Sequence, residues 1–72
     1  MKKVKINKVT KMGIVTLFHT TDKIVYSRED VTEDYDKVKN IIEGSTIEYI
    51  SNELKVETGE IWDKASVIKE VK

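Results

Sequence analysis

The side chains of this chain that can take part in chemistry are mostly cations and aromatic rings. Lysine and arginine neutralise phosphates and aromatic rings stack on nucleobases, so the combination is typical of surfaces that hold single-stranded nucleic acid. Lys2 and Lys8 add to the basic residues of the N-terminal part. The candidate binding residues are Lys3, Lys5, Lys11, Phe18, His19, Lys23, Tyr26, Arg28 and Trp62.

Catalysis and metal binding find no support in the residue types present. The chain has one histidine and no cysteine, so a thiolate or histidine cluster that holds a metal is excluded. It also has no G-x-S-x-G motif and no glycine-rich phosphate loop, so no nucleophile is paired with a base. We therefore predict a protein that is not an enzyme and uses no metal or cofactor.

Charge divides the chain into two unlike parts, although its 13 Lys and Arg balance its 13 Asp and Glu. Residues 1–28 carry six Lys, one Arg and one acid, whereas residues 29–72 carry six Lys and twelve acids. Zero net charge argues against a protein devoted to nucleic acid, for which a strongly basic domain is usual. The polarity of +6 against −6 also suits an adaptor or inhibitor that docks to a protein partner, or head-to-tail self-association.

Length and composition predict one small globular domain, residues 1–72. No apolar run approaches the ~20 residues that span a bilayer, so no membrane partner is expected. The absence of cysteine fits a reducing compartment. The sequence thus predicts a cytoplasmic protein.

The first part of the chain has the pattern of a three-stranded meander. Residues 3–7 alternate between polar and apolar side chains, and the alternation slips at Lys8–Val9, as it does at a bend or bulge. Gly13 precedes a β-branched and aromatic run over residues 14–18. After a polar turn, residues 24–26 form a short third strand.

Residues 31–43 change to a helical period, with apolar side chains at positions 31, 35, 38, 41 and 42. Asp30 and Glu33 have the spacing of a capping box, and Gly44 follows where a left-handed C-cap would lie. Asp34 and Asp36 complete an acidic cluster that suits the positive end of a helix dipole. Docking to a basic protein is the alternative role of this cluster.

The last third of the chain admits two interpretations. In the first, residues 45–50 form a strand, residues 51–60 a loop that Trp62 ends, and residues 64–71 a last strand. The fold is then a mainly β, five-stranded antiparallel barrel with one helix between the third and fourth strands. In the second, the apolar spacing over residues 46–68 forms a DNA-binding helix-turn-helix after the meander.

Most of the chain resembles the cold-shock type of oligonucleotide/oligosaccharide-binding (OB) domain. Residues 11–18 (KMGIVTLF) occupy the place of the family's K-G-F-G-F-I motif, and residues 24–28 (IVYSR) that of V-F-V-H-F. Residues 43–49 (EGSTIEY) are similar to E-G-x-x-V-x-F, and Ala65 and Ile68 have the spacing of A-x-x-V. The resemblance implies a small OB barrel that binds single-stranded RNA or DNA.

The chain departs from this family at the residues that stack on bases. Where the family has aromatic rings, this chain has Ile14, Val25 and Arg28, and Ser27 replaces a histidine. The resemblance therefore implies the barrel, while the stacking surface has to come from other side chains.

Each remaining ring has a structural role as its alternative. Phe18 suits the core, because large aromatic side chains dominate small cores. Tyr26 suits either side of a strand, and His19 suits an exposed strand end. Trp62 either stacks on a base or anchors a protein partner, or it closes one end of the barrel.

Overall fold

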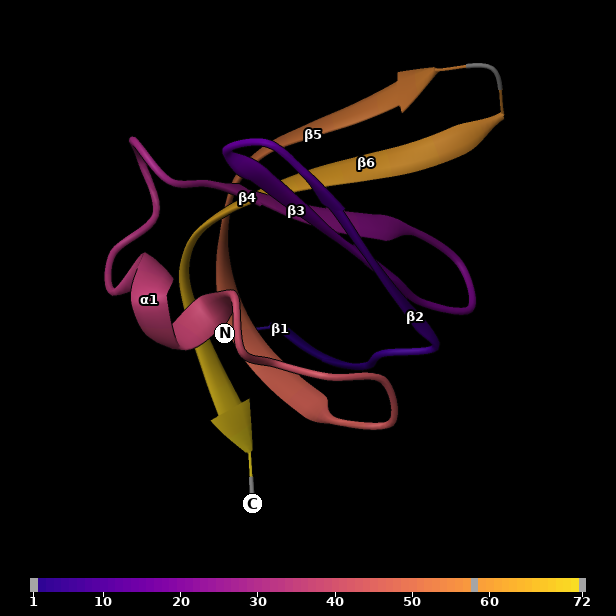
Figure 1. The fold of residues 1–72 in the computed structure, drawn as a ribbon. Coiled ribbons are helices and arrows are strands. Elements are labelled where there is room, and N and C mark those ends of the chain that lie inside the picture. Colours follow the sequence, from indigo (N-terminus) through magenta and orange to yellow (C-terminus); the bar gives the residue numbers. More distant parts are fainter. Residues whose placement is uncertain (1, 58, 72) are drawn as a thin grey trace.

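The computed structural model describes residues 2–57 and 59–71, which form a mainly β structure (Figure 1). The mainly β fold class predicted from the sequence is thus confirmed. The helical residues in this part of the chain amount to a single turn. In chain order the elements are β1 (Lys2–Lys5), β2 (Lys8–Met12), β3 (Val15–His19), β4 (Ile24–Arg28), α1 (Tyr35–Val38), β5 (Thr46–Glu57) and β6 (Glu60–Val71).

The six strands belong to one sheet, in the order β1-β5-β6-β4-β3-β2. Neighbouring strands are antiparallel except β4 and β6, which run parallel where Ile24–Tyr26 lies against Trp62–Lys64. The sheet is therefore mixed rather than antiparallel throughout. β1 and β2 follow one another in the chain, yet they lie at opposite ends of the strand order.

The chain passes from one end of the sheet to the other at Ile6 and Asn7. Ile6 donates its N–H to the carbonyl of Ser45, directly before β5, at 2.9 Å. The next residue, Asn7, donates to the carbonyl of His19 in β3 at 2.7 Å. The slip predicted at Lys8–Val9 therefore corresponds to a change of strand partner slightly earlier in the chain.

β5 and β6 form a long hairpin of 12-residue strands that projects beyond the other strands in Figure 1. The predicted loop over residues 51–60 is therefore wrong, and so is the helix-turn-helix over residues 46–68. Register shifts at residues 50–53 change which side chains point inward. The alternation of apolar and polar residues is therefore broken in the middle of β5, and the sequence pattern did not indicate one continuous strand. Gly59, at φ 80°, lies in the turn, and Trp62 lies inside β6 rather than in a loop.

The helix is much shorter than the residues 31–43 predicted from the sequence, because α1 comprises Tyr35–Val38 alone. The segment before it bonds partly to β6. The N–H of Glu33 donates to the carbonyl of Ser66 at 3.0 Å. The left-handed backbone of Asp34, at φ 53°, interrupts a right-handed helix there. After α1, Asn40 and Ile41 bond three residues back, to Lys37 and Val38, instead of continuing the α-helix.

The predicted capping residues also have other roles. Asp34, at φ 53°, is the N-cap residue and makes no side-chain capping bond, so the capping box does not form. Asp30 instead accepts a hydrogen bond from Arg28 at 2.9 Å. Gly44 has the positive φ of a C-cap, at 87°, but it lies in the turn before β5 rather than at the helix end.

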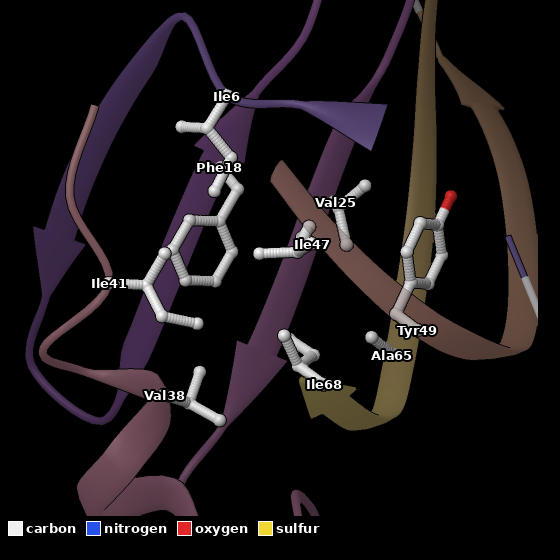
Figure 2. Packing of buried hydrophobic residues seen from close by; sticks show 9 residues of the cluster. All are labelled: Ile6, Phe18, Val25, Val38, Ile41, Ile47, Tyr49, Ala65 and Ile68. Atoms are coloured by element: carbon white, nitrogen blue, oxygen red, sulfur yellow. The ribbon is translucent and has the colours of Figure 1, made fainter. Parts of the chain in front are cut away.

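The core collects side chains from the strands, from α1 and from the segments beside them. Figure 2 shows these side chains pointing toward one another, with the Phe18 ring from β3 among them. Val38 and Ile41 reach the core from the helical region, whereas Val31 and Ile42 stay exposed. Phe18 is fully buried, so it has its structural role. The cluster consists of Ile6, Phe18, Val25, Val38, Ile41, Ile47, Tyr49, Ala65 and Ile68.

Replacement Phe18→Ala should lower the free energy of unfolding by about 3–5 kcal/mol, because it leaves a cavity in the core. Domains of this kind have a total stability of roughly 5 kcal/mol, so the variant should be largely unfolded. The midpoint of urea unfolding, followed by circular dichroism, measures this. Ile42→Ala is the control, since that side chain is 69% exposed. A Phe18→Ala variant as stable as the control would contradict the described core.

Candidate functional site

Alternation along the strands separates a buried side of the sheet from an outward side. In β4, Val25 and Ser27 are buried and the other three residues are half-exposed. β6 has the same alternation around the buried Asp63. The outward side chains of β4 and β6, together with those that β3 and β2 place beside them, form what we call the outer face. It includes Lys8, His19, Ile24, Tyr26, Arg28, Trp62 and Lys64, and the buried Leu17 lies opposite Tyr26 on β3.

Tyr26 and Trp62 lie at the centre of the outer face. Their ring centroids are 5.8 Å apart and their planes are inclined by 66°, which is the edge-to-face arrangement that aromatic rings favour. The parallel register of β4 and β6, with Ile24 opposite Trp62, brings the rings together. The structure thus joins two predicted site residues from different halves of the chain.

Cations and an imidazole flank the two rings. Lys64 of β6 lies opposite Tyr26, and Arg28 follows on β4. On the other side, β3 contributes His19, and Lys8 of β2 lies opposite it. The outer face therefore carries the two kinds of group that stacking on bases and neutralisation of phosphates require.

Two members of the outer face also have polar partners. The His19 Nε2 atom lies 3.1 Å from the Thr10 hydroxyl. Arg28 donates to Asp30 at 2.9 Å, and both side chains of this pair are exposed. An exposed ion pair contributes only ~0–1 kcal/mol. Arg28 can therefore exchange Asp30 for another anion at small cost.

The other cations predicted as site residues lie away from the two rings. Lys3 and Lys5 lie on β1, which β5 and β6 separate from β4 in the strand order, and Lys3 is 3.8 Å from Glu48. Lys11 lines a hollow shared with the segment after α1. Lys23 lies in the turn between β3 and β4, beside the outer face.

Lys64 is an outer-face cation that the sequence analysis missed. Side chains two residues apart in a strand point to the same side, so Lys64 shares a face with Trp62. The sequence predicts this only if the last strand begins before Trp62. With Trp62 at the end of a loop, as predicted from the sequence, the strand that contains Lys64 has no outward residue to set its alternation.

Asp63 lies directly behind the outer face as a fully buried carboxylate that accepts hydrogen bonds from three donors. The Tyr49 hydroxyl donates to it at 2.7 Å and the Lys2 ammonium at 3.1 Å, and the Ser51 hydroxyl donates as well. These donors come from β1 and β5, so they fix the start of β6 against both strands. The neighbouring residue, Trp62, is positioned with it.

The same contacts shift the pKa values of the buried groups. Burial alone would raise the pKa of Asp63, but the hydrogen bonds from Ser51, Tyr49 and Lys2 hold it below its ordinary value of 3.8. Burial, followed by the bond to Asp63 and its charge, raises the pKa of Tyr49 far above its ordinary range. At neutral pH the pair therefore consists of an ionised acceptor and a protonated donor.

Replacement Asp63→Asn should destabilise the protein by about 1–3 kcal/mol, because the neutral amide keeps one acceptor oxygen and places an NH2 group against the buried donors. A carboxylate whose folded pKa is lowered contributes stability above its unfolded pKa and loses it as the pH falls through the folded value. The free energy of unfolding of the wild type should therefore decrease as the pH drops below about 4. In Asp63→Asn the decrease should be smaller, because residue 63 no longer takes up a proton.

Urea unfolding of both proteins at pH 7, 4 and 3 measures the two effects. Asp36→Asn is the matched control, because the Asp36 side chain is 96% exposed. If wild type and Asp63→Asn lost the same stability between pH 7 and pH 3, the described role of Asp63 would be wrong.

Among the described residues, no three His, Cys, Asp or Glu side chains form a group that could hold a metal ion. No helix within residues 2–57 and 59–71 is long and apolar enough to cross a membrane. Comparisons of the chain with models of known protein families, with curated proteins and with solved structures found no match. The geometry of the outer face is therefore the basis for a functional hypothesis.

Proposed function

We propose that this protein is a small OB-type barrel that binds single-stranded nucleic acid on its outer face. If β1 and β2 are taken as one first strand bent at Ile6 and Asn7, the sheet has five strands and α1 lies between the third and the fourth. The halves of that strand lie at opposite ends of the strand order, as closure of the sheet on itself requires. OB barrels bind their ligands on the second and third strands, which correspond to β3 and β4 here.

The observation that carries the proposal is the Tyr26–Trp62 pair with cations beside it. Both rings are partly buried and partly exposed, so part of each ring's surface is open to a base. Stacking on an aromatic side chain contributes ~1–3 kcal/mol per base and tolerates any base. Arg28 and Lys64 lie on the same face and can contact the phosphates between stacked bases. Because such contacts are local, they do not need a net positive charge on the chain.

Replacement Trp62→Ala should weaken the binding of a short mixed single-stranded oligonucleotide by about 1–3 kcal/mol, which is roughly 5- to 150-fold in Kd. Fluorescence anisotropy of a labelled oligonucleotide at low salt measures the affinity. Ile42→Ala changes an exposed side chain that is not part of the outer face, so this variant should bind as wild type does. Equal affinity of Trp62→Ala and wild type would reject the proposal, as would a wild-type protein that does not bind.

Replacement Lys64→Gln should reduce the slope of log K against log salt concentration by about 0.7, because one phosphate contact to a single strand is lost. Lys69→Gln removes the same charge from an exposed position of the same strand, opposite Glu48. It should leave the slope unchanged. Identical slopes for both variants would show that phosphates do not lie beside Tyr26.

A second candidate is a protein-interaction module, which the far part of the β5–β6 hairpin favours. Leu54 and Val56 are 55% and 68% exposed there. Charge polarity supports this candidate less than the sequence suggested, because β1 of the basic part pairs with β5 of the acidic part and the Lys3–Glu48 pair joins them. An oligonucleotide titration that leaves a well-dispersed amide NMR spectrum unchanged would favour this candidate over the first.

A further inference from the structure

The far part of β5 has a strand partner on one side only. In the described part of the chain, the neighbours of β5 in the sheet are β1 and β6. β6 pairs with β5 as far as Glu57, whereas β1 covers the opposite edge over Thr46–Tyr49 and does not continue beyond it. Alternate N–H and C=O groups of a strand point to either side, so the edge formed by residues 51–57 presents backbone donors and acceptors to another chain.

This edge also carries apolar side chains that the fold leaves exposed. Leu54 and Val56 are 55% and 68% exposed, and neither belongs to the core cluster. They lie opposite Asp63 and Ile61 on β6, two residues apart and therefore on the same side of the hairpin. A regular edge strand with apolar side chains is a template for pairing with a further strand. The strand that fits it has to supply apolar side chains of its own.

The sequence of this edge is complementary to itself. Residues 51–57 read S-N-E-L-K-V-E, with Leu54 at the midpoint. Antiparallel pairing about a twofold axis at Leu54 pairs the whole edge with its copy and sets Glu53 opposite Lys55 twice, and opposite charges in such positions stabilise a strand pair. An axis at Lys55 would set this lysine against itself, and one at Val56 would leave most of the edge unpaired. We propose that the protein forms a twofold dimer by pairing residues 51–57 of two copies.

The dimer is weak and joins the two outer faces. Two short edges and their side chains bury less than the ~1,200 Å² of a standard interface, so dimerisation requires a high protein concentration. Lys55 lies opposite Trp62, on the outward side of the hairpin. A twofold axis perpendicular to the strands and to the sheet keeps the outward sides of both copies together on one continuous sheet. The dimer itself does not depend on the proposed function.

Sedimentation equilibrium without nucleic acid, at about 10 µM to 1 mM protein, measures the association. The apparent mass of the wild type should rise from that of a monomer toward that of a dimer. Lys55→Glu and Glu53→Lys should each raise the dissociation constant about tenfold or more, because two pairs of opposite charges become pairs of like charge. The double variant with both changes should restore the wild-type association. Lys55 also interacts within its own chain, so the double variant is the decisive one.

Lys11→Glu is the matched control, because it makes the same charge change at an exposed residue of β2 and should dimerise as wild type does. Circular dichroism checks that each variant is folded, and concentration-dependent amide NMR shifts of the wild type should concentrate on residues 51–57. A wild type that remains monomeric at the highest concentration would overturn the proposal and leave this edge to a different protein. So would shifts confined to other strands, a double variant that does not associate, or equal weakening by Lys11→Glu and Lys55→Glu.

Discussion

The buried carboxylate of Asp63 is the interaction on which the arrangement of the strands depends most. An ionised group inside a protein is costly unless donors surround it. Here Lys2 comes from β1, Tyr49 and Ser51 come from β5, and Asp63 comes from β6. Ser51 lies at the register shift in β5, which resets the side chains that point inward. The register shift in β5 therefore occurs at the residue whose hydroxyl donates to the buried Asp63 carboxylate.

The same carboxylate links the interior of the sheet to its outer face. Successive side chains of a strand point to opposite sides, so a fixed inward Asp63 also fixes the outward Trp62 and Lys64. A ring held by a strand in this way is positioned more firmly than one carried by a loop. Its pairing with Tyr26 across the parallel contact of β4 and β6 restricts it further. The outer face thus depends on polar contacts that lie behind it.

The features of the fold that depend on neighbouring residues in the chain were predicted correctly from the sequence. The mainly β class and the strands around Phe18 and Tyr26 follow from alternation and β-branched residues, and burial decides that Phe18 belongs to the core. The helix of residues 31–43 was overestimated, because Asp34 has a left-handed backbone and Glu33 before it bonds to β6, a partner that no local pattern contains. The long hairpin was missed because the shift at residues 50–53 breaks its period. Lys64 was missed as a consequence.

Folding brings together the basic and acidic parts of the chain, which are separate in the sequence. The chain is basic before residue 29 and acidic after it, but β1 of the basic part pairs with β5 of the acidic part, and Lys3 lies 3.8 Å from Glu48 across that pairing. The long-range attraction that a separated polarity would give to a charged partner is thereby reduced. A neutral chain of this kind attracts an anionic strand weakly at a distance. Under the proposed function, affinity for such a strand has to come from short-range contacts, of which stacking on Trp62 and Tyr26 offers the largest that does not depend on salt.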